Sequence, residues 1–255
     1  MGQDEASTGL LGPLAAWQHP GLQALAEWAT TVETQWAKGL ALPQVLNAMW
    51  GTSRFVAHDA LPPHEPYERF IGQHQQVPTR PNAHDALNAW CWMQWPRLKQ
   101  HFNALQCEAI ARDGIQSRRG PVRDAITVFD ENGLFLQASD AIWQAVVDHD
   151  WQRAFVTHRA DWSHCRLAVV GHALLENLIR PFKGITAHVL RWPEAWGDSL
   201  DAVEVHATQH LAATVLASKP FHPLPVMGIP GWMPQQDEAF YNDPQVFRPK
   251  RVKLR

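Results

Sequence analysis

The side chains in this chain that are best suited to chemistry include a polar row on one predicted helix. His84 and Asn88 are four residues apart, so they share one helical face, and Trp92 continues that row. Lys99 and Asn103 repeat the four-residue spacing further along the chain. Imidazole, amide and ammonium groups can polarise a bound molecule or exchange protons with it. Such groups interleaved with tryptophans predict a binding site on this segment.

A second segment places a histidine and a carboxylate on one helical face. His172 and Glu176 have i, i+4 spacing. That spacing can bring a nitrogen and an oxygen ligand to one metal ion, or can fix the tautomer of the histidine. The two side chains could equally bond to each other. Gly171, inside the predicted helix Trp162–Arg180, costs about 1 kcal/mol of helix propensity relative to Ala, which is tolerable if another backbone or a ligand approaches closely.

Taken together, the two segments suggest metal-dependent hydrolysis. A catalytic zinc site has about four ligands, of which one is water, and the bound water can act as the nucleophile. Zinc, iron and manganese are all possible occupants. Without a metal, the same residues could carry out acid–base chemistry on a small molecule. The predicted metal ligands are His84, His172, Glu176 and His188, and Asp85 is the predicted general base.

The expected ligand of this site is a small anion, and the expected reaction is hydrolysis of a phosphate ester or an amide. Arg119 and Arg123 flank a Gly-Pro turn, and guanidinium groups beside a turn suit phosphate or carboxylate. They could instead pair with Asp113 and Asp124, which is the more ordinary interpretation. In the enzyme hypothesis these arginines and Trp92 contact the substrate, and Asn88, Lys99 and Asn103 polarise it.

The apolar pattern predicts an α+β fold that is mainly helical. Alternating apolar residues on both sides of Asp130-Glu131-Asn132-Gly133 indicate a β-hairpin at about 125–138. The two acids then belong to a turn, where bonding to local amides is their expected role. A third short strand is expected at 185–191, and the Pro-rich segment 219–234 should be extended over the surface. Helices are expected at Pro20–Gly39, Pro43–Trp50, Pro66–Gly72, 83–95, Arg97–Ala111, Ser199–Ala217 and, in two pieces, 139–180.

Composition points to an ordinary globular protein. The chain has 255 residues, of which 45% are hydrophobic and 18% charged. No run approaches the roughly 18 apolar residues of a membrane helix, so we expect no membrane insertion. The three cysteines form no CxxC pair. Because a basic segment followed by an apolar core is also missing at the start, we expect a reduced, cytoplasmic protein.

Charge is distributed unevenly along the chain. The last eight residues carry five positive charges, and this leaves −8 for the rest of a chain whose net charge is −3. We expect a mobile N-terminus at 1–9, one globular domain at 10–247 and a basic tail at 248–255. The tail could contact nucleic acid, but a solvated end is the more ordinary role, and the acidic remainder argues against extended nucleic-acid contact.

Several sequence blocks also resemble a known family. They are VPTRPNAHDALNAWCWMQWPRLKQHFNALQ, GPVRDAITVFDENG, GHALLENLIRP, ITAH, LPVMGIPGW and FYNDPQVFRP. In this order they resemble a bacterial family described as domain of unknown function 3025, over roughly residues 40–250. The resemblance implies a bacterial cytoplasmic protein. It assigns no catalytic residue.

A non-enzymatic binding or interaction protein is the competing hypothesis. Thirteen tryptophans and a basic tail would suit a protein interface or a stacking surface for nucleic acid. Most of these tryptophans have helical spacing and apolar neighbours, which is typical of core packing. The two classes of function differ in one geometric respect. The enzyme hypothesis requires His84, His172, Glu176 and His188 to meet in a cavity.

Overall fold

Helices form most of the architecture in a computed structural model that describes residues 9–12, 19–116 and 118–250. The predicted class, α+β and mainly helical, is confirmed. The α-helices are α1 (Ala26–Ala37), α2 (Leu42–Trp50), α3 (Tyr67–His74), α4 (Ala83–Gln94), α5 (Pro96–Asp113), α6 (Pro121–Asn132), α7 (Asp140–Asp148), α8 (His172–Ile179), α9 (Leu200–His210), α10 (Ala213–Ala217) and α11 (Glu238–Tyr241). Short helical turns are η2 (Pro20–Leu25), η3 (His58–Ala60), η4 (Arg153–Thr157), η5 (Ala160–His164), η6 (Glu194–Trp196) and η7 (Val226–Gly228).

The strands form two sheets. β1 (Phe55–Ala57) and β2 (Val77–Thr79) are a parallel pair. The larger sheet has the order β4-β3-β5-β6, in which β3 is antiparallel to β4 and parallel to β5. Its strands are β3 (Gly133–Gln137), β4 (Arg166–Val169), β5 (Thr186–Arg191) and β6 (His222–Pro225).

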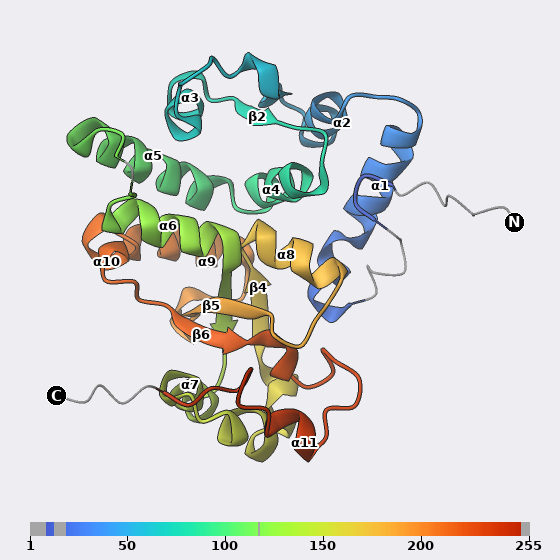
Figure 1. Cartoon of the computed structure of the whole chain (residues 1–255), viewed down its shortest axis with the longest axis vertical. Helices are drawn as coiled ribbons and strands as arrows, with labels where there is room; N and C mark the ends of the chain where they lie inside the picture. Colours follow the sequence, from blue (N-terminus) through green and yellow to red (C-terminus); the bar gives the residue numbers. More distant parts are fainter. Residues whose placement is uncertain (1–8, 13–18, 117, 251–255) are drawn as a thin grey trace, which may run out of the picture.

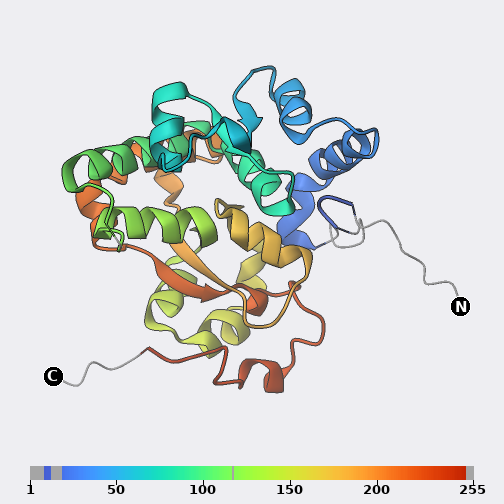
Figure 2. The ribbon, with the colours of Figure 1, turned by 45° about the horizontal axis from the view of Figure 1, so that its top comes forward.

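The elements are layered around the larger sheet. Helices α6 and α8 cover one face, and α4 and α5 pack on top of those helices (Figure 1). Helices α7 and α11 lie on the opposite side of the sheet, and the same arrangement is visible after rotation (Figure 2). Leu134, Phe135 and Leu136 of β3 are all fully buried, with Leu134 and Leu136 in one core cluster and Phe135 in another, on the opposite face of the sheet. The candidate site lies where α4, α5, α6 and α8 meet.

The break between α4 and α5 follows directly from local sequence. Asn82 caps α4, because its side chain accepts a hydrogen bond from the Asp85 amide at 2.8 Å. Pro96 lacks an N–H, so α4 ends before it and α5 starts there. Trp95, at the break, is fully buried and donates its indole N–H to the Val169 carbonyl at 2.9 Å. The helices expected at 83–95 and Arg97–Ala111 are thus present as α4 and α5, and Trp95 fastens the bend between them to β4.

The predicted β-hairpin at 125–138 is wrong. Its first half is the end of helix α6, and only its second half is a strand, β3. The apolar residues Val122, Ala125, Ile126 and Phe129 repeat at helical spacing and are buried together, so a period of 3.6 describes this segment better than a period of 2. Gly120 and Pro121 start the helix. Asp130 and Glu131 therefore lie on the last turn of a helix and not in a hairpin turn.

The predicted helix 162–180 is also wrong in its first half. That half is strand β4, and α8 begins at His172 with Gly171 as its N-cap. The Gly133 carbonyl accepts hydrogen bonds from the amides of Val170, at 2.9 Å, and Gly171, at 3.0 Å. A Cβ atom on Gly171 would lie 2.4 Å from the Glu131 carbonyl oxygen. The close approach expected at Gly171 is thus present, but at a helix start and not inside a helix.

The remaining predictions divide between strands and termini. The strand at 185–191 is present as β5, and part of the Pro-rich segment forms β6 at the sheet edge, where proline is tolerated. Residues 1–8 of the expected N-terminal segment and 251–255 of the expected tail lie outside the described residues. In the described part of the chain, every helix is too short or too polar to span a bilayer.

The contact at Gly171 predicts a cost for any side chain. Gly171→Ala would push a methyl group into the backbone at Glu131, so we expect a loss of about 1–3 kcal/mol in the free energy of unfolding. Gly184→Ala is the matched control, since the nearest atom to its Cβ belongs to the Phe182 ring at 3.5 Å. We expect a change within about 0.5 kcal/mol for the control. Urea unfolding measures both, and equal stabilities of the two variants would contradict the prediction.

Candidate functional site

A cavity of about 380 Å³ lies where α3, α4, α5 and α6 meet the start of α8. Most of the side chains that the sequence predicted for a site line this cavity. They are His84, Asp85, Asn88, Trp92, Lys99, Asn103, Arg119 and His172. The i, i+4 row on α4 and its continuation on α5 therefore face one space. Arg123, Glu176 and His188 are not among the lining residues.

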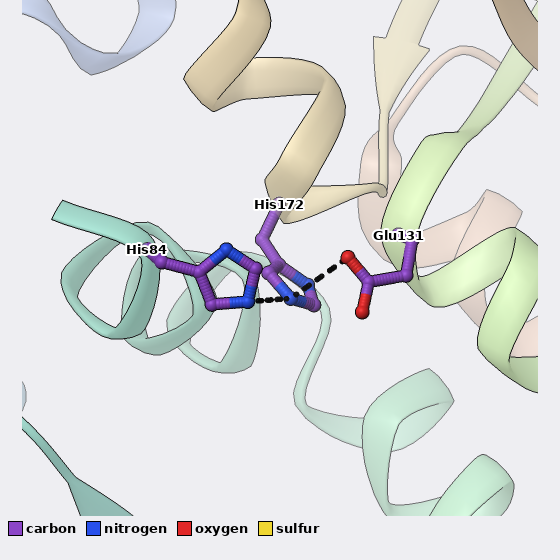
Figure 3. Close-up of side chains that lie close together, drawn as sticks. All are labelled: His84, Glu131 and His172. Carbon is purple, nitrogen blue, oxygen red and sulfur yellow. Dashed lines mark hydrogen bonds and ion pairs between the residues drawn. The ribbon is translucent and has the colours of Figure 1, made fainter.

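At one end of the cavity, His84, Glu131 and His172 form what we call the His–Glu–His group (Figure 3). Nε2 of His172 lies 3.1 Å from Nε2 of His84 and 3.5 Å from a carboxylate oxygen of Glu131. Within the described residues this is the one set of three His, Cys, Asp or Glu side chains whose ligand atoms lie within 4.8 Å of one another. The three come from the first turn of α4, the last turn of α6 and the first residue of α8.

Each imidazole of the group has a carboxylate near its other nitrogen. The Glu176 carboxylate accepts a hydrogen bond from Nδ1 of His84 at 2.8 Å. Asp130 places an oxygen 3.9 Å from Nδ1 of His172, a nitrogen that is buried and without a hydrogen-bond partner in the described part of the chain. The Glu176 carboxylate fixes the proton of His84 on Nδ1 and leaves Nε2 of that ring free to act as a ligand. The Nε2 atoms of His84 and His172 lie close together.

Burial sets the protonation of the group. Burial lowers the pKa of His172 to about 4, so the ring is neutral near pH 7 and can donate a lone pair. Burial also raises the pKa of Glu131, although the charge of His84 opposes that shift. For Asp130, burial alone would raise the pKa, but the Lys99 ammonium together with His172 and His84 outweighs burial, and the net pKa is lowered.

A polar chain extends from the group along the cavity wall. Lys99 is 4% exposed and donates to Asp130 at 2.5 Å and to the Asn88 side-chain oxygen at 2.9 Å. Asn88 in turn donates to the Tyr67 hydroxyl at 3.2 Å. Burial, together with the charges of Asp85 and Asp130, raises the pKa of Tyr67, so its hydroxyl remains protonated. The wall therefore carries a fixed sequence of donors and acceptors.

Two predicted residues are engaged in ion pairs. Asp85 accepts two hydrogen bonds from the Arg80 guanidinium, at 3.1 and 2.9 Å, and one from the Arg80 amide at 2.7 Å. Arg123 pairs with Glu68 at 3.1 Å. The Asp85 carboxylate is therefore engaged in hydrogen bonds with the β2–α4 connection.

Other charged neighbours also differ from expectation. Asp113 and Asp124, the expected partners of the arginine cluster, pair with Arg112 and Lys219. Arg119 lines the cavity and is exposed. Its guanidinium is near enough to Glu131 to influence the pKa of that carboxyl.

The structure brings together only part of the predicted ligand set. His84 and His172 meet at their Nε2 atoms, while Glu176 bonds to the opposite nitrogen of His84 and not to His172, its i, i+4 neighbour. His188 lies on β5 with its ring 6.2 Å from that of Phe221, apart from the group. The third member of the group is Glu131, and not the expected ligands Glu176 or His188.

Sequence reasoning missed Asp130, Glu131 and Tyr67. The alternating apolar pattern predicts a hairpin turn at Asp130 and Glu131. The helical spacing of the buried residues Val122, Ala125, Ile126 and Phe129 is the signal that places the two acids at a helix end. Tyr67 follows a proline-rich stretch and has no local pattern that marks it. Only packing of α3 on α5 brings it to the cavity.

A family model described as "Protein of unknown function (DUF3025)" matches residues 53–251, which is most of the chain. The chain belongs to this family. The match includes all three members of the His–Glu–His group. No curated protein and no solved structure matches the chain.

The polar wall predicts a stability effect at Lys99. Lys99→Met would leave the Asp130 carboxylate without its ammonium partner, and we expect a loss of about 2 kcal/mol, between the values for surface and fully buried pairs. The double variant with Asp130→Asn should recover part of this loss, because no unpaired charge remains. Lys183→Met is the control. It breaks a more exposed pair with Asp243, at 2.8 Å, and should cost clearly less stability than Lys99→Met does.

Denaturant unfolding of the four proteins measures these differences. Equal losses for Lys99→Met and the double variant would contradict a role for Lys99 in neutralising Asp130.

Proposed function

We propose that this protein is a metal-dependent hydrolase that acts on a small anionic molecule. The observation that carries the proposal is the His–Glu–His group, in which two imidazole Nε2 atoms and a carboxylate converge at a cavity. Two histidines and one carboxylate leave room for water on a zinc ion and are also the ligand set of many non-haem iron sites. Zinc, iron and manganese are therefore the candidate metals.

The spacing of the ligand atoms supports this assignment. Two nitrogen ligands at ordinary zinc distances and a tetrahedral angle lie about 3.3 Å apart. The two Nε2 atoms are 3.1 Å apart, and the Glu131 oxygen lies 3.5 Å from one of them. Small side-chain movements would thus bring all three atoms onto one ion. Glu176 and Asp130 would serve as the outer carboxylates that orient the histidines.

The reaction follows from the chemistry of such an ion. A zinc ion held by His84, Glu131 and His172 would lower the pKa of a bound water to about 7, and so would supply a nucleophile near neutral pH without a separate strong base. Hydrolysis of a phosphate ester or an amide is the reaction class that such a nucleophile suits. Asp85 is not needed as the general base predicted from the sequence, since Arg80 holds its oxygens.

Substrate contacts come from the remaining cavity residues. Arg119 is exposed at the cavity and suits the capture of an anion. Trp92 and Phe102 offer apolar surface, and Asn88, Lys99 and Asn103 offer polar groups that can polarise the bound molecule. Arg123 is held by Glu68 and would act indirectly.

A tryptophan-rich interaction surface receives less support. Each tryptophan in the described residues is buried or half-buried. Stacking on nucleic acid or on a partner needs exposed rings. The cavity with its His–Glu–His group is the more specific feature of the chain.

Metal content tests the proposal directly. Protein purified without an affinity tag, and then dialysed against zinc, iron(II) or manganese(II), should hold close to one metal ion per chain by elemental analysis. His172→Ala and Glu131→Ala should each lower that content severalfold, because each removes one of three ligands. His188→Ala is the matched control, and it should bind metal as the wild type does.

Three results would speak against the proposal. They are a folded wild type that stays metal-free in all three dialyses, equal metal content in the ligand variants, and loss of metal in His188→Ala alone. A positive result justifies assays with phosphate esters and amides.

The outer carboxylates predict a graded effect. Glu176→Gln keeps the size of the side chain but weakens its hold on Nδ1 of His84, so we expect metal affinity to fall about 10- to 100-fold. The site should still fill at saturating metal, unlike that of His172→Ala. Competition with a chelator measures the affinity. An unchanged affinity would show that Glu176 does not orient His84.

A further inference from the structure

We propose that Tyr67, Asn88 and Lys99, which we call the donor row, bind an oxyanion group of the ligand, either a carboxylate or a phosphate. The identity of this ligand as a substrate rests on the proposed function. The oxyanion site itself does not, because its three members are separate from the His–Glu–His group.

Lys99 fixes the orientation of the whole row. Its ammonium group has donors only, so the Asn88 atom at 2.9 Å from it must be the side-chain oxygen. The amide nitrogen of Asn88 therefore faces Tyr67 and donates to the phenolic oxygen at 3.2 Å. Because the phenolic oxygen accepts this bond, the Tyr67 hydroxyl proton is left to donate elsewhere.

The donor row has more hydrogen-bond donors than the protein uses. Lys99 has three N–H groups and uses two, on Asn88 and Asp130. Asn88 has two N–H groups and uses one, and its oxygen is taken by Lys99. In the described part of the chain the Tyr67 hydroxyl donates to no protein acceptor. Each residue thus retains one donor, while the Asn88 oxygen is already engaged.

All three residues line the same cavity, so the spare donors have a common space to serve. A ligand rich in acceptors, such as a carboxylate or phosphate, satisfies several donors at once. A cation or an amine would find no matching acceptor in the row. Charge-assisted bonds from N–H and O–H groups to such anions are also stronger than neutral ones.

The position of the row sets the shape of the ligand. Asn88 is four residues after His84 on α4, which is about one helical turn, or roughly 5–6 Å. The oxyanion would therefore sit about one turn away from the His–Glu–His group. Trp92, whose ring lies 5.4 Å from the Lys99 ammonium, and Phe102 supply apolar contacts nearby. The expected ligand is therefore a compact molecule in which a short spacer separates an anionic group from the bond that reacts.

The test is titration of metal-free and zinc-loaded protein with two probes, inorganic phosphate and succinate, by isothermal titration calorimetry. We expect at least one probe to bind metal-free wild type, and the better probe identifies the oxyanion. Tyr67→Phe removes one donor to a charged group, so its affinity should fall about tenfold. Tyr241→Phe is the matched control. It changes a phenol that bonds to the Gly228 carbonyl, away from the cavity, and should bind as the wild type does.

Asn88→Asp provides a second variant if Tyr67→Phe folds poorly. It keeps an oxygen for Lys99 but loses the amide donors and adds a negative charge, so binding should be lost. Circular dichroism and thermal unfolding confirm that each variant is folded.

The outcomes separate the two proposals. Binding to metal-free protein that Tyr67→Phe and Asn88→Asp weaken supports the donor row, even if no metal binds. Binding only to zinc-loaded protein, unaffected by Tyr67→Phe, would assign the anion to the metal and overturn the donor row while leaving the hydrolase proposal intact. The donor-row proposal would also be overturned if neither probe bound the metal-free or the zinc-loaded protein. The same holds if Tyr241→Phe weakened probe binding as much as Tyr67→Phe does.

Discussion

The close approach of two backbones at Gly171 is the constraint on which the candidate site depends. The chain reverses from β4 into α8 directly against the end of α6, and a Cβ atom there would lie 2.4 Å from the Glu131 carbonyl oxygen. The Gly133 carbonyl closes the junction by accepting two amide hydrogen bonds. Only glycine fits such a contact without moving one of the backbones. Because the contact joins a helix end to a helix start, it sets Glu131 beside His172.

Helix ends supply the other parts of the site. His84 lies in the first turn of α4, where the Asn82 cap and the Arg80–Asp85 pair fix the entry of the chain. Packing of α4 on α8 then brings the two imidazoles to 3.1 Å. Side chains at helix ends can converge from several directions, whereas residues on one helix face all point the same way. This explains why His172 meets a histidine from another helix and not its own i, i+4 neighbour.

Charge compensation shapes the cavity as much as packing does. Lys99 neutralises Asp130, Arg80 holds Asp85 and Arg123 holds Glu68, so most acids near the cavity have a basic partner. An unpaired acid in such partly buried surroundings would be costly. Glu131 differs, since its neighbours are imidazoles and its pKa is raised by burial. A divalent cation would relieve that cost, which is the electrostatic basis of the metal proposal.

The sequence by itself determined the mainly helical α+β class, the two helices that form α4 and α5, and the polar row that faces the cavity. These features depend on local rules, namely helical periodicity, capping and the missing N–H of proline. The tertiary structure alone decided that Asp130 and Glu131 end a helix, that β4 occupies the start of the predicted 162–180 helix, and that Tyr67 joins the row. A short segment with apolar residues at both spacings is settled by what packs against it, and convergence of residues 40 to 90 positions apart is not encoded in any local pattern. His188 illustrates the limit, because its type suited a ligand while its strand turned it towards Phe221.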